Sequence, residues 1–103
     1  MLQVGPWVVA ARQIASDYKT GVAPEWILRD DARRIERTFR FRNFREALAF
    51  VHRVGELAET EGHHPDISFG WGYATVSLST KNIKGLHEND FIMASKIDRM
   101  LSS

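Results

Sequence analysis

Residues 43–65 read NFREALAFVHRVGELAETEGHHP, and this stretch contains the start, the body and the end of a helix. Asn43 is a favoured N-cap residue, and Glu46 three positions later completes a variant of the capping box. Apolar residues then recur at i, i+3 and i+4 spacing: Phe44, Ala47, Leu48, Val51, Val54, Leu57 and Ala58. This periodic signal, the strongest in the chain, runs to Glu61 and stops at Gly62, a typical helix-ending residue. The sequence therefore predicts an amphipathic helix that ends beside two histidines.

The two histidines, His63 and His64, are enclosed between Gly62 and Pro65, whose ring fixes the backbone. Histidine both gives and takes protons near neutrality, because its unperturbed pKa is about 6.5. An isolated pair at a helix C-terminus is more often a surface feature that interacts with the helix dipole. A metal site is disfavoured, because adjacent histidines in a rigid turn point apart and neither of the other two histidines adds ligand spacing.

Two strands are predicted before this helix, WILR at 26–29 and RIERTFRF at 34–41, joined at Asp30 and Asp31. The second strand places Ile35, Phe39 and Phe41 on one face, with Arg37 as the exception. The other face carries Arg34, Glu36, Thr38 and Arg40. One face of this strand is therefore expected to be buried.

A hairpin is predicted after the helix, with ISFGWGY at 67–73 and ATVSLST at 74–80 turning near Gly72. A last helix begins near His87, with Glu88 and Asp90 favouring its positive end, and it is expected to bury Phe91, Ala94, Ile97 and Leu101. The segment PWVVAARQIASDY at 6–18 predicts one further helix, at the N-terminal side.

The order helix-strand-strand-helix-strand-strand-helix predicts a single α+β domain over residues 1–103. We expect a four-stranded antiparallel sheet with helices packed on one face. The opposite face is rich in Thr, Ser and Arg, and it is free for solvent or for a second subunit.

The composition and the net charge exclude several classes of chemistry and of binding partner. The 44% of hydrophobic and 26% of charged residues are typical of a globular protein, and the absence of cysteine excludes disulfides and thiolate chemistry. The net charge of +1 implies neither nucleic acid nor an anionic membrane as partner. The arginine-rich stretch at 33–45 is interrupted by Glu36 and fits a solvated strand face better than a nucleic-acid stripe. No apolar run approaches the ~20 residues of a membrane span, and no secretory signal is present, so the expected location is cytoplasmic.

Several of these segments together resemble a known family, the pterin-4a-carbinolamine dehydratases, also called 4a-hydroxytetrahydrobiopterin dehydratases. The resemblance runs from Glu59 through EGHHPDI, then through Trp71 and the strand that ends in Ser79 and Thr80, to GLHENDFIMASKID at 85–98. It extends back through Phe44, Phe41, Phe39 and Trp26, and covers roughly residues 24 to 101.

The resemblance implies a site in which three catalytic residues, His63, His64 and the residue at the Lys81 position, surround a pterin and handle its protons, supported by Asp90 and Glu59. It also implies that Trp26 lines the pocket and that Pro65, Ser79 and Thr80 contribute to substrate binding. Lys81 stands where the family usually carries a third histidine. It further implies a homodimer or homotetramer and neither a metal nor a cofactor.

The chemistry implied by the resemblance is the dehydration of a 4a-hydroxytetrahydropterin released by an aromatic amino acid hydroxylase. The reaction needs one proton delivered to the departing hydroxyl and one removed from N5, which two imidazoles can supply. Their separate roles stay open, because adjacent titrating groups couple. Lys81 would be a permanent cation, able to hold a carbonyl but a poor base, which predicts a weakened enzyme. The alternative is a non-catalytic relative of the same fold, such as a transcription-factor dimerisation cofactor or a Rubisco assembly factor.

Overall fold

The computed structural model describes residues 22–83 and 85–102. The elements follow in the order β1 (Ile27–Arg29), β2 (Arg34–Arg40), α2 (Phe44–Glu61), β3 (Asp66–Gly70), β4 (Tyr73–Leu78), the single 3-10 turn η1 (Lys81–Ile83) and α3 (Glu88–Ser102). This order confirms the two predicted hairpins with a helix after each. The helix predicted at 6–18 lies outside the described residues.

The four strands form one antiparallel sheet, as predicted, and the structure gives their order in it as β1-β2-β4-β3. The predicted turn near Gly72 is confirmed: this residue has a positive φ of 79°, a conformation that favours glycine. The last strand is shorter than the sequence suggested and ends at Leu78. Thr80 instead forms an isolated bridge with Gly85, which draws the chain out of the sheet and into η1.

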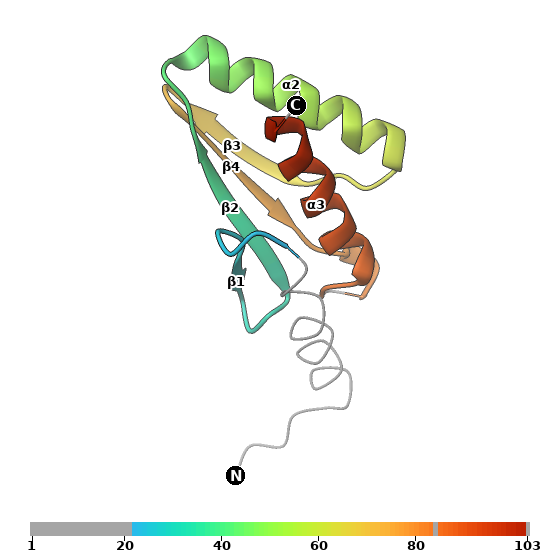
Figure 1. The fold of residues 1–103 in the computed structure, drawn as a ribbon. Coiled ribbons are helices and arrows are strands. Elements are labelled where there is room, and N and C mark those ends of the chain that lie inside the picture. The colour runs from blue at the N-terminus through green and yellow to red at the C-terminus, as the bar shows by residue number, and fades with distance from the viewer. Residues whose placement is uncertain (1–21, 84, 103) are drawn as a thin grey trace.

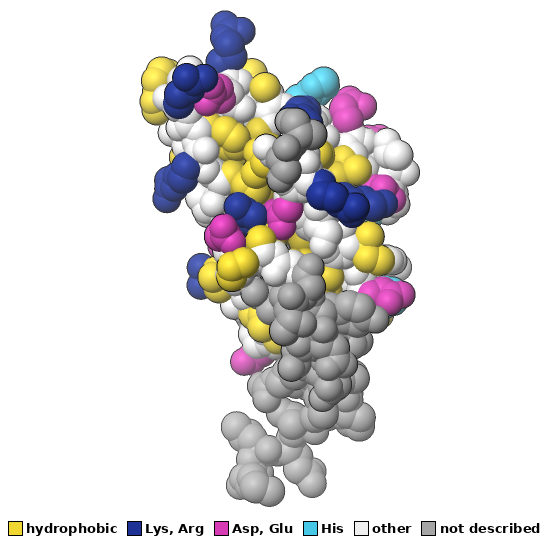
Figure 2. Space-filling model, viewed as in Figure 1, with side chains coloured by type: hydrophobic (Ala, Val, Ile, Leu, Met, Phe, Trp, Pro, Cys, Tyr) yellow, Lys and Arg dark blue, Asp and Glu magenta, His cyan; other side chains and the backbone are white. Residues whose placement is uncertain are grey.

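Both described helices cover the same face of the sheet (Figure 1). The buried residues of the sheet lie in register, with Ile35 opposite Leu78 and Phe39 opposite Ala74. The helices contribute most of the remaining core residues: Phe50, Val54 and Ala58 from α2, and Phe91, Met93, Ala94 and Ile97 from α3. Trp26 and Leu86, which lie outside the strands and helices, complete it. Figure 2 shows further hydrophobic side chains between α2 and α3. Among the described residues, no helix combines the length and apolarity that crossing a membrane requires.

The helix α2 has the predicted caps, but the face that it buries is rotated from the predicted stripe. The Asn43 side chain accepts a hydrogen bond from the Glu46 N–H at 2.9 Å, as a capping residue does. Phe44 and Leu48 are 42% and 48% exposed, whereas Phe50 is buried. A wide apolar stripe leaves the rotation of a helix undetermined, and contact with β3 and β4 decides it. The prediction that Leu101 is buried is wrong for the same reason, since it is 43% exposed.

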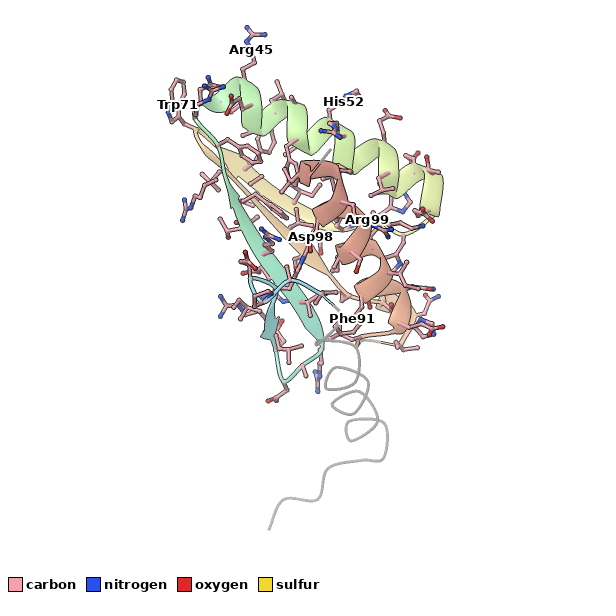
Figure 3. All side chains as sticks on the ribbon, in the orientation of Figure 1. Arg45, His52, Trp71, Phe91, Asp98 and Arg99 are labelled. Atoms are coloured by element: carbon pink, nitrogen blue, oxygen red, sulfur yellow. The ribbon has the colours of Figure 1, made fainter. Side chains whose placement is uncertain are left out.

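Arg37, the exception to the pattern of β2, faces the helices because it has a charged partner there. Its Nη1 donates to the Asp98 carboxylate on α3 at 2.8 Å, and its guanidinium lies 4.5 Å from the Phe39 ring centre. The Trp26 indole N–H donates to the same carboxylate, on the side of α3 that is turned toward the sheet (Figure 3). The charge therefore lies inside the fold because it is paired.

Candidate functional site

The two histidines leave α2 in a direction that the helix end fixes. Gly62 has a left-handed backbone with φ 66°, and its N–H donates to the Ala58 carbonyl. The His63 N–H donates to the same carbonyl at 3.2 Å. Both bonds satisfy the same carbonyl at the end of the helix, and the bond from His63 is the 6→1 bond of a Schellman motif. His63 and His64 therefore lie in a short connection held at one end by α2 and at the other by β3.

One buried carboxylate, that of Asp90, joins the end of α2 to the end of β4 and the start of α3. Its side chain is fully buried. Oδ1 lies 2.5 Å from His63 Nε2, while Oδ2 accepts from the Thr80 hydroxyl at 2.8 Å and from the His87 N–H at 2.9 Å. A buried carboxylate with three partners is held firmly, because losing any one of them would leave a charge poorly satisfied.

The partners of Asp90 favour one tautomer of His63. The Thr80 hydroxyl and the His87 N–H both donate to this carboxylate, and an ionised carboxylate only accepts, so we assign Nε2 of His63 as the donor of the third bond. In the neutral ring, Nδ1 then has the free lone pair. The His63 side chain is 20% exposed, so it is held by the fold and still reaches the surface. This arrangement is suited to accepting a proton.

His64 is held more loosely than His63. Its Nε2 is hydrogen-bonded to the Glu59 carboxylate, and both side chains are mostly exposed. An exposed ion pair of this kind contributes little to stability. We therefore assign Glu59 the role of orienting the His64 ring and not that of stabilising the fold.

A hollow of about 340 Å³ lies beside the histidines, and it is lined by Gly62, His63, His64, Ser79, Thr80 and Asn82. Its size falls within the range of small-molecule pockets. On the other side of His63 is a smaller hollow of about 150 Å³, lined by Glu61, Gly62, His63, Asn89, Ile92 and Met93. In the described part of the chain, His, Cys, Asp and Glu side chains form no group of three that could hold a metal ion.

Most of the residues predicted for the site come together here. His63, His64, Ser79 and Thr80 line the hollow, Asp90 lies behind His63, and Glu59 contacts His64. Pro65 immediately precedes β3. The backbone of Lys81 begins η1, directly after Thr80.

Two tryptophans that carry the resemblance, Trp26, which was predicted to line the pocket, and Trp71, lie away from the hollow beside the histidines. Trp26 is fully buried in the core, where its indole N–H bonds to Asp98, and it does not line the hollow. Trp71 is 75% exposed in the β3–β4 turn, near Arg45 at the start of α2 (Figure 3). The 18 residues of α2 span about 27 Å, which separates Trp71 from the histidines at the other end of the helix.

Two residues of the site were not predicted, Asn82 and His87. Asn82 lines the hollow from η1, and its only signal was a polar residue in the loop after a strand. His87 starts α3: its Nδ1 accepts the Asn89 N–H at 3.2 Å while Asp90 accepts its own N–H. This is a variant of the capping box with His in place of Ser or Thr and Asp in place of Glu or Gln. The sequence predicted that the last helix begins near His87, but not that His87 is hydrogen-bonded to Asp90.

The sequence and the fold of this chain are both similar to those of known proteins. The sequence profile described as "Pterin 4 alpha carbinolamine dehydratase" matches residues 9–100. The chain belongs to this family. A Cupriavidus pinatubonensis protein provisionally named pterin-4-alpha-carbinolamine dehydratase 1 is 65% identical over 77 residues, which is 75% of this chain and 66% of that protein. A Syntrophotalea carbinolica protein with the same provisional name is 50% identical over 101 residues, covering 96% of this chain and 88% of the relative.

Solved structures of the family show the same fold. A Brucella melitensis crystal structure described as a transcriptional coactivator/pterin dehydratase superposes with a TM-score of 0.75 at 27% identity, over 82% of this chain and 89% of that one. A pterin dehydratase-like protein described as a RuBisCO assembly factor in the alpha-carboxysome has a TM-score of 0.66 at 24% identity, over 77% of this chain and 92% of that one. At that identity, the second likeness concerns the fold alone.

Proposed function

We propose that this protein dehydrates a 4a-hydroxytetrahydropterin to the quinonoid dihydropterin. The observation that carries the proposal is His63, which is oriented by the fully buried Asp90 and lines a hollow together with His64. Membership of the family and the names of the relatives that this chain resembles support the same reaction.

The reaction needs only an acid and a base. The C4a–O bond breaks and the hydroxyl leaves as water after taking up one proton. N5 gives up its proton, and the electron pair of the N5–H bond forms the N5–C4a double bond. No electrons enter or leave, so neither an oxidant nor a reductant takes part. A positioned acid or base contributes about 10²-fold or more to the rate.

His63 is the better candidate for the base that takes the proton from N5. Its Nε2–H is committed to Asp90, which leaves Nδ1 to accept, and the buried carboxylate stabilises the imidazolium that forms. His64, oriented by Glu59, then delivers the proton to the hydroxyl. Ser79 and Thr80 bound the space in which the pterin lies.

We assign Lys81 the position of the third histidine found in the family. It follows Thr80 directly, and Thr80 lines the hollow. A lysine ammonium donates hydrogen bonds and holds a carbonyl oxygen, but it is not an effective base near neutrality. The expected consequence is an active but slower enzyme.

Stopped-flow measurement of pterin dehydration tests the proposal with three matched substitutions. His63→Ala and His64→Ala should each lower kcat/KM by about 10²-fold or more. His64→Ala should change the melting temperature little, whereas His63→Ala should also lower it, because it removes one partner of the buried Asp90 carboxylate. His52→Ala is the control, because His52 is exposed on the outer side of α2 and pairs only with Glu56 in the described structure (Figure 3). If His63→Ala and His64→Ala were as active as the parent, as the His52→Ala control is expected to be, the assignment of the site would be wrong.

The alternative function is that of a non-catalytic scaffold. The exposed side chains of Phe44, Leu48 and Trp71 favour this alternative, because they offer an apolar surface for contact with a partner. A parent protein that is folded but inactive on the pterin would support it.

We also propose that the protein forms a homodimer or homotetramer, which light scattering at micromolar concentration would test. The aromatic amino acid hydroxylase as metabolic partner and the cytoplasmic location stay predictions.

A further inference from the structure

An ion pair links the end of α2 to the middle of α3, next to the candidate site. Lys96 Nζ on α3 donates to the carboxylate of Glu61, which is the last residue of α2. The Lys96 and Glu61 side chains are 35% and 32% exposed, about half as much as the side chains of the His64–Glu59 pair. Neither Glu61 nor Lys96 lines the hollow beside the two histidines. The ion pair therefore belongs to the surroundings of that hollow and not to its lining.

The smaller hollow separates the end of α2 from α3 at this point. This space of about 150 Å³ has α2 and its connection to β3 on one side, with Glu61, Gly62 and His63, and α3 on the other, with Asn89, Ile92 and Met93. Side chains on either side of an unfilled space lose the packing contacts that would fix two elements relative to each other. Contacts that cross the gap must therefore set the distance between the end of α2 and α3.

Two polar contacts cross the gap beside this hollow. Glu61 pairs with Lys96, and His63, two residues after Glu61, bonds to Asp90. Asp90 and Lys96 are six residues apart on α3, which is about 9 Å along the helix. The bond from the His63 N–H to the Ala58 carbonyl holds His63 to the last turn of α2. A displacement of the end of α2 therefore moves His63 relative to Asp90.

The position of Glu61 is unfavourable for its own helix. The C-terminus of a helix carries a partial negative charge, so it attracts cations and repels a carboxylate. The last turn of α2 has no basic residue, and it contains both Glu59 and Glu61. The opposite charge comes from Lys96 on α3. An acidic residue at position 61 thus serves the contact with α3 and not the stability of α2.

The effect of this ion pair on a reaction can exceed its effect on stability. A partly exposed pair contributes little to the stability of a fold, because water screens it. In contrast, a misplacement of about 1 Å can lower the rate of a reaction by about 10²-fold. The distance that the pair controls is the one between His63 and Asp90, on which proton transfer at His63 depends.

We propose that Glu61 and Lys96 are positioning residues, whose ion pair holds the end of α2 at the distance from α3 at which His63 Nε2 bonds to Asp90. The proposal rests on the proposed function and adds to it two residues outside the pterin hollow. The charges at these two positions govern turnover, while pterin binding does not depend on them.

Charge reversal tests the ion pair. Glu61→Lys and Lys96→Glu each place like charges opposite each other, which pushes the end of α2 away from α3. Each should lower kcat about three- to tenfold in stopped-flow dehydration and leave KM unchanged, because neither side chain lines the pterin hollow. The protein with both substitutions carries the ion pair in reverse, and its kcat should return to within about twofold of the parent value.

A second measurement follows His63 directly and does not depend on activity. A ring proton held between Nε2 and a buried carboxylate exchanges slowly with water. The chain has four histidines, so the signal of this proton in histidine-labelled protein is identified by NMR as the one that disappears in His63→Ala. The proton should exchange faster in both single variants and return to the parent rate in the double variant.

Arg53→Ala is the control, because Arg53 also links α2 to α3. Its Nη2 donates to the Met100 carbonyl at 3.2 Å, and it lies eight residues before Glu61, about 12 Å along α2. The control and the charge reversals should each change Tm by a few degrees at most. Only the control should keep both the kcat and the His63 signal of the parent.

Two results would overturn the proposal. One is a pair of single variants with the kcat and the His63 signal of the parent, and the other is a double variant that recovers neither. A parent that does not turn over the pterin would instead reject the dehydratase function, and the exchange rate of the His63 proton would still decide whether the ion pair positions the ring.

Discussion

Replacing Asp90 by Asn is the most informative single change, because it keeps the shape of a fully buried side chain and removes its charge. Asn has one acceptor oxygen and one NH₂ group. If the oxygen keeps the Thr80 and His87 donors, the NH₂ group faces His63 Nε2. Two donors then oppose each other, and His63 must move its proton to Nδ1. The nitrogen that we assign as the base would no longer have a free lone pair.

The magnitude of the effect follows from the lost bonds. Hydrogen bonds to a charged group contribute about 1.5–3 kcal/mol, so Asp90→Asn should lower the stability by about that amount. For a domain of this size, each 1 kcal/mol corresponds to a change of about 4–8 °C in Tm. Loss of a correctly oriented general base lowers the rate by about 10²–10⁴-fold. The fall in activity should therefore greatly exceed what partial unfolding explains.

Asp98→Asn is the matched control. Asp98 is likewise a carboxylate on α3, and it accepts hydrogen bonds from the side chains of Trp26 and Arg37. This variant should lose a comparable amount of stability, because the same kind of charged hydrogen bond is removed, and keep kcat/KM within about threefold of the parent. Both variants would be compared by thermal unfolding and by stopped-flow dehydration below their melting temperatures. A folded Asp90→Asn protein that is as active as Asp98→Asn would refute the role given to the carboxylate.

Three further predictions follow. Ala32 has a positive φ of 63°. Ala32→Gly should raise Tm, because relief of about 1–2 kcal/mol of left-handed strain exceeds the entropy cost of glycine, about 0.5–1 kcal/mol; a lower Tm would contradict the strain. Hydrogen bonds from the Arg42 side chain hold the pKa of Glu46 below its usual range, so this stabilisation is present above the unfolded pKa and is lost as pH falls through the folded pKa. In the Glu46→Gln variant, Tm should therefore fall less steeply than in the parent between about pH 5 and 3. An equal slope of Tm against pH in both proteins would contradict this role of Glu46. Lys81→His should raise kcat/KM, and an increase of about tenfold would correspond to about 1.4 kcal/mol; a decrease would show that the ammonium has a role of its own.

Local signals in the sequence were sufficient for the helix that leads to the site. Asn43 and Gly62 act within one turn of their own positions, so the start and the end of α2 could be predicted from neighbouring residues. The alternation along β2 likewise identified its buried face, because side chains of a strand point to opposite sides in turn. The pair His63 and His64 at the end of that helix was visible for the same reason.

The tertiary structure decided what those local signals left open. Which part of the α2 stripe is buried depends on the sheet beneath it, and Phe50 rather than Phe44 lies in the core for that reason. The sequence by itself determined where the helix ends and that two histidines follow it. Only the fold brought Asp90, 27 residues further along the chain, into hydrogen-bond contact with His63, and Ser79 and Thr80 to the hollow that His63 and His64 line. The physical reason is that caps and periodicity act over a few residues, whereas a buried charge and a shared pocket depend on contacts between segments that are distant in sequence.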